Sequence, residues 1–162
     1  MDGASIRYHG DKKILKLLDK LVSPQMRQQL LDAIAAYGVS STHQRFLDQT
    51  GPDGVKWKKS RRAESTGGQT LRLTARLFQS LVSEATPTSA AWGTNVAYAG
   101  IHQLGGVIKA KSAEFLTFRG LNGGFTRVKQ VVIPARPYLG ISAMDSDRID
   151  RIAGDWVEGM AQ

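Results

Sequence analysis

The chain contains no cysteine among its 162 residues, which excludes disulfides, thiolate metal sites and catalysis by a thiol. It also has no apolar run of about 18 residues, so no membrane-spanning helix is expected. The first residues, Met1-Asp2-Gly3-Ala4-Ser5, have neither the basic nor the apolar stretch of a signal peptide. These absences fit a reducing cytoplasm, and we expect no contact with a membrane.

The sequence also lacks a recognisable arrangement of catalytic or metal-binding residues. His9, His43 and His102 are far apart and form no ligand pair. His102 has no carboxylate near it in the sequence to orient it as a base, so we expect its ring to donate to backbone carbonyls at a helix end. The glycine-rich stretch 120–124 lacks the Gly-Lys-Ser/Thr that completes a phosphate-binding loop. We therefore expect no enzymatic activity, no cofactor and no metal.

Acidic residues are scarce in two long stretches, and the formal net charge is +8. The stretch from Lys56 to Arg76 contains seven basic residues and one acidic residue. The stretch from Lys109 to Arg136 contains six basic residues and one acidic residue. After Pro137 the sign reverses, with five acidic residues against two basic ones. Such segregation indicates a nucleic-acid partner or an acidic surface on a protein partner, although a solvated basic surface is the simpler alternative. The candidate residues for contacting a neighbouring subunit or DNA are Lys56, Lys58, Lys59, Arg61 and Arg62.

Hydrophobic periodicity predicts several helices. Residues 11–22 have an apolar stripe opposite four lysines, which should pack on the core or on a neighbouring subunit. Ser23-Pro24 is a typical helix start, and the helix that follows should extend to about Gln49 with a kink or break near Gly38. Further helices are expected at 70–80, 96–104 and 142–160.

Alternating apolar residues predict a small antiparallel sheet. Its strands are expected at 81–86 and 89–94, followed by a hairpin of 114–118 and 127–133 with a loose tip at 119–124. The expected fold class is α+β, with long N-terminal helices and a C-terminal helix packed against the sheet. We expect one domain over residues 1–162, with mobile loops at about 56–70 and 119–126.

A composite motif lies between Asn95 and Gly140. Its first half, Tyr-Ala-x-Ile-His-Gln-x-Gly-Gly at 98–106, ends a short helix at a glycine pair. Its second half, Ile-Pro-Ala-Arg-Pro-Tyr-Leu-Gly at 133–140, cannot be helical because two prolines restrict the backbone. This second segment should be rigid, with both prolines extended and Tyr138 at least half buried. Two shorter motifs lie upstream: Phe46…Gly51-Pro52-Asp53-Gly54…Trp57 and Leu73-Thr74-Ala75-Arg76-Leu77…Ser80.

Through these motifs the chain resembles the phage virion morphogenesis family, the tail-completion proteins of Mu-like and related contractile-tailed phages. The resemblance covers roughly residues 24–150, and Ala75 stands where the pattern Leu-x-x-Thr-Gly-x-Leu-x-x-Ser would have glycine. The residues that carry the family signature, which we expect to act in structure and assembly, are Tyr98, Ala99, His102, Gln103, Gly105, Gly106, Pro134, Arg136, Pro137, Tyr138, Leu139 and Gly140.

The resemblance implies a structural protein that forms a ring at the head–tail junction or tail end and completes the tail or joins it to the head. Its expected partners are further copies of itself, as a hexamer that matches the symmetry of the tail, and other neck or tail proteins. DNA passing through the ring is a further candidate. The protein would be in the host cytoplasm during assembly and in the virion afterwards. The alternative is a basic nucleic-acid-binding module without catalytic activity, although neither basic stretch interleaves aromatic residues with its charges.

Overall fold

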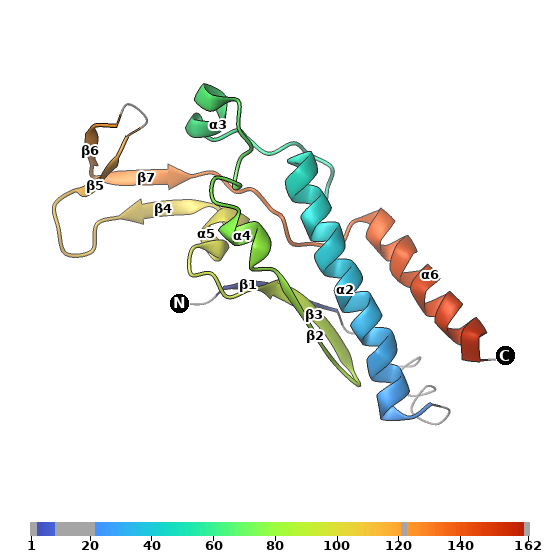
Figure 1. Cartoon of the computed structure of the whole chain (residues 1–162). Coiled ribbons are helices and arrows are strands. Elements are labelled where there is room, and N and C mark those ends of the chain that lie inside the picture. The colour runs from blue at the N-terminus through green and yellow to red at the C-terminus, as the bar shows by residue number, and fades with distance from the viewer. Residues whose placement is uncertain (1–2, 9–21, 121–122, 161–162) are drawn as a thin grey trace.

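The computed structural model describes residues 3–8, 22–120 and 123–160. The amphipathic helix expected at 11–22 falls almost wholly outside them. The elements are β1 (Ala4–Tyr8), α2 (Pro24–Asp48), α3 (Arg61–Thr66), α4 (Arg76–Gln79), β2 (Val82–Thr86), β3 (Ser89–Thr94), α5 (Ala99–Leu104), β4 (Gly106–Lys109), β5 (Leu116–Arg119), β6 (Phe125–Val128), β7 (Gln130–Ile133) and α6 (Ala143–Met160) (Figure 1). The fold class is α+β, as the sequence predicts.

The body of the molecule is a three-stranded antiparallel sheet, in the order β1-β3-β2, with α2 packed on one face. α6 lies alongside α2, and its Ile149 joins a buried cluster with Ile34 of α2 and Ala90 of β3 (Figure 1). Ile152, Ala153 and Trp156 extend this contact, as their helical spacing predicts. Val157 and Met160 continue the same apolar spacing in the sequence, which predicts their burial, but both side chains are exposed.

Helix α2 begins where the sequence predicts, since the Ser23 hydroxyl accepts a hydrogen bond from the Met26 N–H at 3.3 Å. The break predicted near Gly38 is wrong, because the helix continues without interruption to Asp48. Gly38 has a different role: a Cβ added there would lie 2.3 Å from the indole of Trp92. The glycine therefore lets β3 pack its tryptophan directly on the helix backbone.

Strand β1 was not predicted from the sequence. It pairs antiparallel with β3, which places Ile6 opposite Trp92. Ala4, Ile6 and Tyr8 pack partly on the core, whereas Ser5 and Arg7 are exposed. The alternation is regular but only five residues long, and it pairs with a strand more than 80 positions away along the chain. An alternation this short does not predict a strand by itself, because the strand is stabilised by the side chains of the strand that it pairs with.

Two further two-stranded ladders form what we call the arm, residues 106–120 and 123–133. β5 pairs with β6, so Leu116 lies opposite Val128, which confirms the first part of the predicted hairpin. The second predicted strand, 127–133, is wrong as a single unit, because β7 leaves β6 and pairs with β4, a strand the sequence did not predict. The arm extends away from the body on the side opposite to α6 (Figure 1).

Several boundaries expected between α2 and β4 also need correction. Part of the loop expected at 56–70 is helix α3, which begins at Ser60, whose hydroxyl caps the Ala63 N–H, and ends at Gly67 with φ 70°. The helix expected at 70–80 contracts to α4, because Leu71 and Ala75 have φ of 62° and 56°, which break a right-handed helix. The helix expected at 96–104 starts later, at Ala99.

Candidate functional site

The motifs that carry the resemblance converge at one place, where the arm joins the body. We call this place the signature junction: residues 98–106, residues 133–140, and the segment 45–58 that packs against them. The signature residues of the first two segments are about 30 positions apart in the sequence, and the third is 40 or more positions from either. Their meeting point is therefore a property of the tertiary fold.

Gln103 of α5 holds the backbone of the Pro-Tyr-Leu segment. Its Oε1 accepts hydrogen bonds from the N–H groups of Tyr138 and Leu139, each at 3.0 Å. Its Nε2 donates to the Leu139 carbonyl at 2.9 Å. This segment belongs to no strand, so its backbone groups depend on a side chain for partners. Gln103 supplies both kinds of partner from one amide.

Tyr138 is the centre of the packing in the junction. Its exposed fraction is 0%, which confirms the prediction that it is at least half buried. Its hydroxyl donates to the Ala99 carbonyl at 3.2 Å, and its ring centroid lies 5.2 Å from that of Phe46. Burial raises the pKa of Tyr138 to about 12. A tyrosine held neutral in this way acts as a structural donor.

The 45–58 segment is bonded directly to the second half of the motif. The Trp57 indole donates to the Pro137 carbonyl at 2.9 Å, and the Arg136 Nε donates to the Lys58 carbonyl at 2.7 Å. Gly140 lies against Pro52, since a Cβ added to the glycine would be 2.5 Å from Cγ of the proline. The motif at 46–57 and the motif at 133–140 are separate in the sequence but pack against each other in the structure.

Gly105 fixes the direction in which the arm leaves α5. It has φ 71°, and a Cβ there would lie 2.7 Å from the backbone nitrogen of Ala135. The adjacent hydrogen bond, from the Arg136 N–H to the His102 carbonyl at 2.8 Å, joins the two halves of the motif just before the arm begins. Only glycine fits both the left-handed backbone and the close approach.

A buried ion pair anchors the junction to α6. Arg45 of α2 pairs with Asp145 of α6, and its other terminal nitrogen donates to the carbonyls of Tyr138 at 3.0 Å and Gly140 at 2.8 Å. Both charged side chains are at least 90% buried. Neither Arg45 nor Asp145 was identified from the sequence, since an acidic residue in the first turn of a helix, such as Asp145, is explained by the helix dipole alone. A helical arginine beside Phe46 gives no sequence signal of burial.

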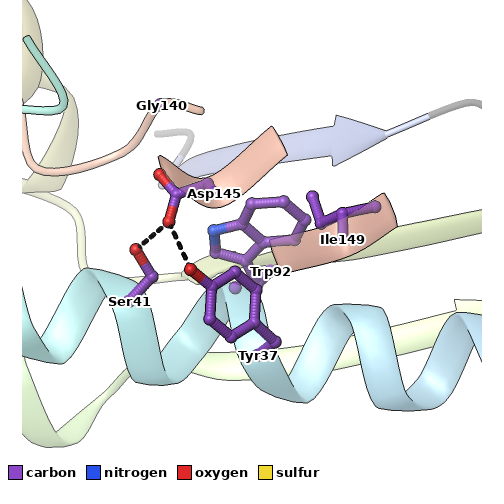
Figure 2. A pocket seen from close by; sticks show the side chains of 7 residues that line it. Tyr37, Ser41, Trp92, Gly140, Asp145 and Ile149 are labelled. Carbon is purple, nitrogen blue, oxygen red and sulfur yellow. Dashed lines mark hydrogen bonds between the residues drawn. The ribbon is translucent and has the colours of Figure 1, made fainter. Parts of the chain in front are cut away.

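Hydrogen bonds hold Asp145 in its ionised form. The hydroxyls of Tyr37 and Ser41 donate to one carboxylate oxygen (Figure 2). The backbone N–H and hydroxyl of Ser142 donate to the other. Burial alone would raise the pKa of Asp145, but the hydrogen bonds from Ser142, Ser41 and Tyr37 outweigh it and lower the pKa to about 2.

The indole of Trp92 lies beneath this carboxylate cluster, and its N–H is buried without a hydrogen-bond partner (Figure 2). The space beside it, lined by Tyr37, Ser41 and Ile149 among others, has no room for a water molecule. The cluster is therefore packed structure, with no volume for a ligand.

His102 does not make the contact that the sequence indicates. Its carbonyl accepts from Arg136, but its ring Nδ1 is buried without a partner in the described part of the chain. Burial lowers the pKa of His102, and Arg136 lowers it further, so the ring is neutral at pH 7. Tyr98 is partly exposed and packs edge-on against this ring, at 5.8 Å between centroids.

The basic residues proposed from the sequence lie around α3, beside the junction. The Lys56 ammonium donates to the Asp48 carbonyl at 2.7 Å, and Arg62 donates to the carbonyl of Gln69. The side chains of Lys58, Lys59 and Arg61 are exposed, with no hydrogen bond or ion pair to any residue in the described ranges. These three charges point to solvent, where a partner could reach them.

Within the described residues, no group of three or more His, Asp and Glu side chains could hold a metal ion. In the same ranges, no helix combines the length and the apolar character needed to cross a bilayer. The signature side chains hold backbone segments together and fix the base of a projecting arm. The fold and the junction thus define a structural domain with a braced extension.

The particular family follows from comparison with known proteins. The phage virion morphogenesis family matches residues 10–158, and the chain belongs to it. Its role is accordingly a structural one in phage assembly, associated with the virion. No curated protein and no solved structure matches the chain.

Proposed function

We propose that the protein forms a closed ring, with six copies, at the head–tail junction or tail end, where it completes the tail or joins it to the head. The observation that carries this proposal is the signature junction. Its hydrogen bonds from Gln103, Trp57 and Arg45 all fix one extended segment next to the arm. Repeated contacts between identical subunits require such a rigid base, because a flexible one would lose affinity to ordering entropy.

The exposed charge around α3 supports a position beside DNA or beside a neighbouring subunit. The side chains of Lys58, Lys59 and Arg61 have no hydrogen-bond or ion-pair partners within the described residues, and these residues follow directly on Trp57, which the junction holds in place. Positive charge on a ring's inner surface would favour the passage of DNA without recognising its sequence. The protein would thus contact DNA through phosphates alone.

This same charge favours a second candidate function, a basic nucleic-acid-binding module that needs no ring. A salt titration of DNA binding separates the two. A dedicated binder should lose affinity steeply between about 50 and 200 mM salt, with a slope set by the number of phosphates that it contacts. A ring subunit should show weak, sequence-independent binding before assembly.

The direct test uses purified full-length protein and tails assembled without it. We expect light scattering to give the mass of six copies, negative-stain images to show rings, and added protein to appear as density at the tail end. Protein that stays monomeric at high concentration and adds no density to tails would contradict the proposal.

A further inference from the structure

The β4–β7 ribbon of the arm has an apolar face that no described residue of its own chain covers. Val107 and Val132 lie opposite each other in the ladder and are 50% and 66% exposed. Two residues along each strand, on the same face, Lys109 lies opposite Gln130, and both are exposed. We call these four residues the arm face.

This ribbon has little support of its own. Its two strands pair only with each other among the described residues, so both outer edges are unpaired. A two-stranded ribbon with an exposed apolar face is marginally stable in water and a ready template for association. A partner that covers the valines would stabilise the arm and bind at the same time.

The outer face of α6 has the complementary character. The residues on this face, which points away from α2, recur at helical spacing and are all exposed: Asp147, Asp150, Arg151, Gly154, Val157 and Glu158, so three acidic residues outnumber one basic residue. Val157 is 50% exposed and would meet the apolar pair of the arm face. The carboxylates would surround it and meet Lys109 and the other exposed cations of the arm, which are Lys111, Arg119, Arg127 and Lys129.

Gly154 adds a steric reason for contact at this place. It lies in the middle of α6, and a Cβ there would have nothing within 4 Å. A glycine at an exposed helical position destabilises the helix relative to alanine, and no contact with the described residues explains it. A strand lying on the helix could use the missing side chain to approach the backbone closely.

We infer that the arm face of one copy docks on the outer face of α6 in the next copy of the same chain. Figure 1 shows the two surfaces at opposite ends of the molecule. A contact between different surfaces of identical subunits is head-to-tail, and it repeats until the ring closes. The inference rests on the proposed ring and specifies which surfaces form it. The valines supply affinity, and the opposite charges align the two surfaces.

The first test is a pair of matched substitutions measured by analytical ultracentrifugation. Val107→Thr with Val132→Thr keeps the β-branched shape but removes the apolar surface, and it should weaken self-association at least tenfold. The control is Val55→Thr with Val82→Thr, since these valines are 63% and 65% exposed outside the arm. The control should assemble like the wild type, and circular dichroism should show that both proteins are folded.

The second pair tests the helix. Gly154→Gln should raise the thermal stability of the monomer, because glutamine is the better helix former, yet weaken assembly at least tenfold. Gly159→Gln is the control, since its Cβ would also meet open space. A loss of assembly with a gain of stability cannot come from unfolding.

Mixing gives the sharpest result. The Val107→Thr, Val132→Thr protein keeps an intact α6, and the Gly154→Gln protein keeps an intact arm face. At a concentration where each is monomeric alone, the mixture should form pairs of one copy each and nothing larger. Pairs form because one good contact is available, and growth stops because both remaining surfaces are disabled.

The outcomes separate the contact from the ring. If the wild type assembles and the double threonine variant assembles equally well, the ring stands and the docking of the arm is wrong. If that variant assembles normally but no longer attaches to tails, the arm face binds another tail protein, which also overturns the inference. A wild type that never self-associates would refute the proposed ring itself.

Discussion

At the scale of single residues, the stability of this domain depends on side chains that form hydrogen bonds with backbone groups. Gln103 is the clearest case, because it bonds three backbone groups of Tyr138 and Leu139 with one amide. Arg45 does the same for the carbonyls of Tyr138 and Gly140. The extended segment 138–140 does not pair with a strand, so these side chains supply the hydrogen bonds that a neighbouring strand would otherwise make.

Replacing Gln103 should therefore lower the free energy of unfolding by more than the exposure of its side chain suggests. Gln103→Ala leaves two N–H groups and one carbonyl without partners, and we expect the free energy of unfolding to fall by about 3 kcal/mol. Gln44→Ala is the control, since that glutamine is exposed on α2 and bonds only Asp48. Urea denaturation followed by circular dichroism measures both. A loss below about 1 kcal/mol for Gln103→Ala would show that the segment does not need the amide.

The Asp145 cluster predicts a pH dependence of stability. Its folded pKa of about 2 lies below the ordinary value of 3.8, so ionised Asp145 stabilises the fold above about pH 4. That contribution, about 2 kcal/mol, should be lost as the pH falls from 4 to 2. Comparing the wild type with Asp145→Asn isolates it: the difference in unfolding free energy should be largest near pH 6 and shrink on acidification.

Asp150→Asn, at an exposed position of α6, is the matched control for the pH experiment. Its effect should stay within about 0.5 kcal/mol of zero across the same pH range. An Asp145→Asn difference that is independent of pH between 6 and 2 would contradict the assignment of an ionised, hydrogen-bonded carboxylate.

Ala75 occupies a backbone conformation that suits glycine, at φ 56° just before α4. The pattern expected from the resemblance has glycine at this position, and the left-handed backbone is a physical reason for such a preference. Ala75→Gly should raise the free energy of unfolding by roughly 0.5–1 kcal/mol, because relief of left-handed strain exceeds the added chain entropy. The same change at Ala36, exposed within α2, should lower it by about 1 kcal/mol. Equal signs for the two substitutions would refute this explanation.

At the scale of elements, α3 is a short helix with little buried surface of its own. It has six residues, buries Ala63 and is flanked by exposed Lys58, Lys59 and Arg61. A helix this short is stable only through its contacts. We expect trypsin to cut this segment readily in free subunits and slowly in assembled rings. Replacing all three cations with glutamine assigns the fragments, and equal cleavage rates in both states would exclude ordering or protection by assembly.

At the scale of the whole molecule, basic and acidic residues are concentrated in different elements. Basic residues dominate the α3 region and the arm, and acidic ones dominate α6. Exposed ion pairs contribute less than about 1 kcal/mol each, so apolar contacts must supply most of the affinity between copies. The stripe expected at 11–22 is a further source of such contact, and it remains a prediction outside the described residues.

Charge reversal tests that division. Asp147→Lys with Asp150→Lys should weaken rings modestly, by roughly tenfold or less in dissociation constant, and reduce their sensitivity to salt. Leu17→Asp with Leu21→Asp, in the predicted stripe, should give monomers at any salt. Light scattering across ionic strength measures both. Reversal that abolishes rings at every salt concentration would mean that charge carries more of the affinity than its exposure allows.

Local sequence patterns by themselves predict several of the secondary-structure elements of this protein. The Ser23-Pro24 start of α2, the β2–β3 pair and the periodicity of α6 follow from capping and side-chain spacing, which act within one or two turns of chain. The family motifs, and the burial of Tyr138, also followed from the sequence.

Only the tertiary structure decided how distant segments combine. Strand β4 and its pairing with β7, the packing of Gly38 on Trp92, and the Arg45–Asp145 pair each join positions more than 20 residues apart. Such contacts leave no periodic signal, because each residue's environment is set by a partner from elsewhere in the chain. The physical reason is that pairing and burial depend on distance in space, whereas capping and periodicity depend on distance along the backbone.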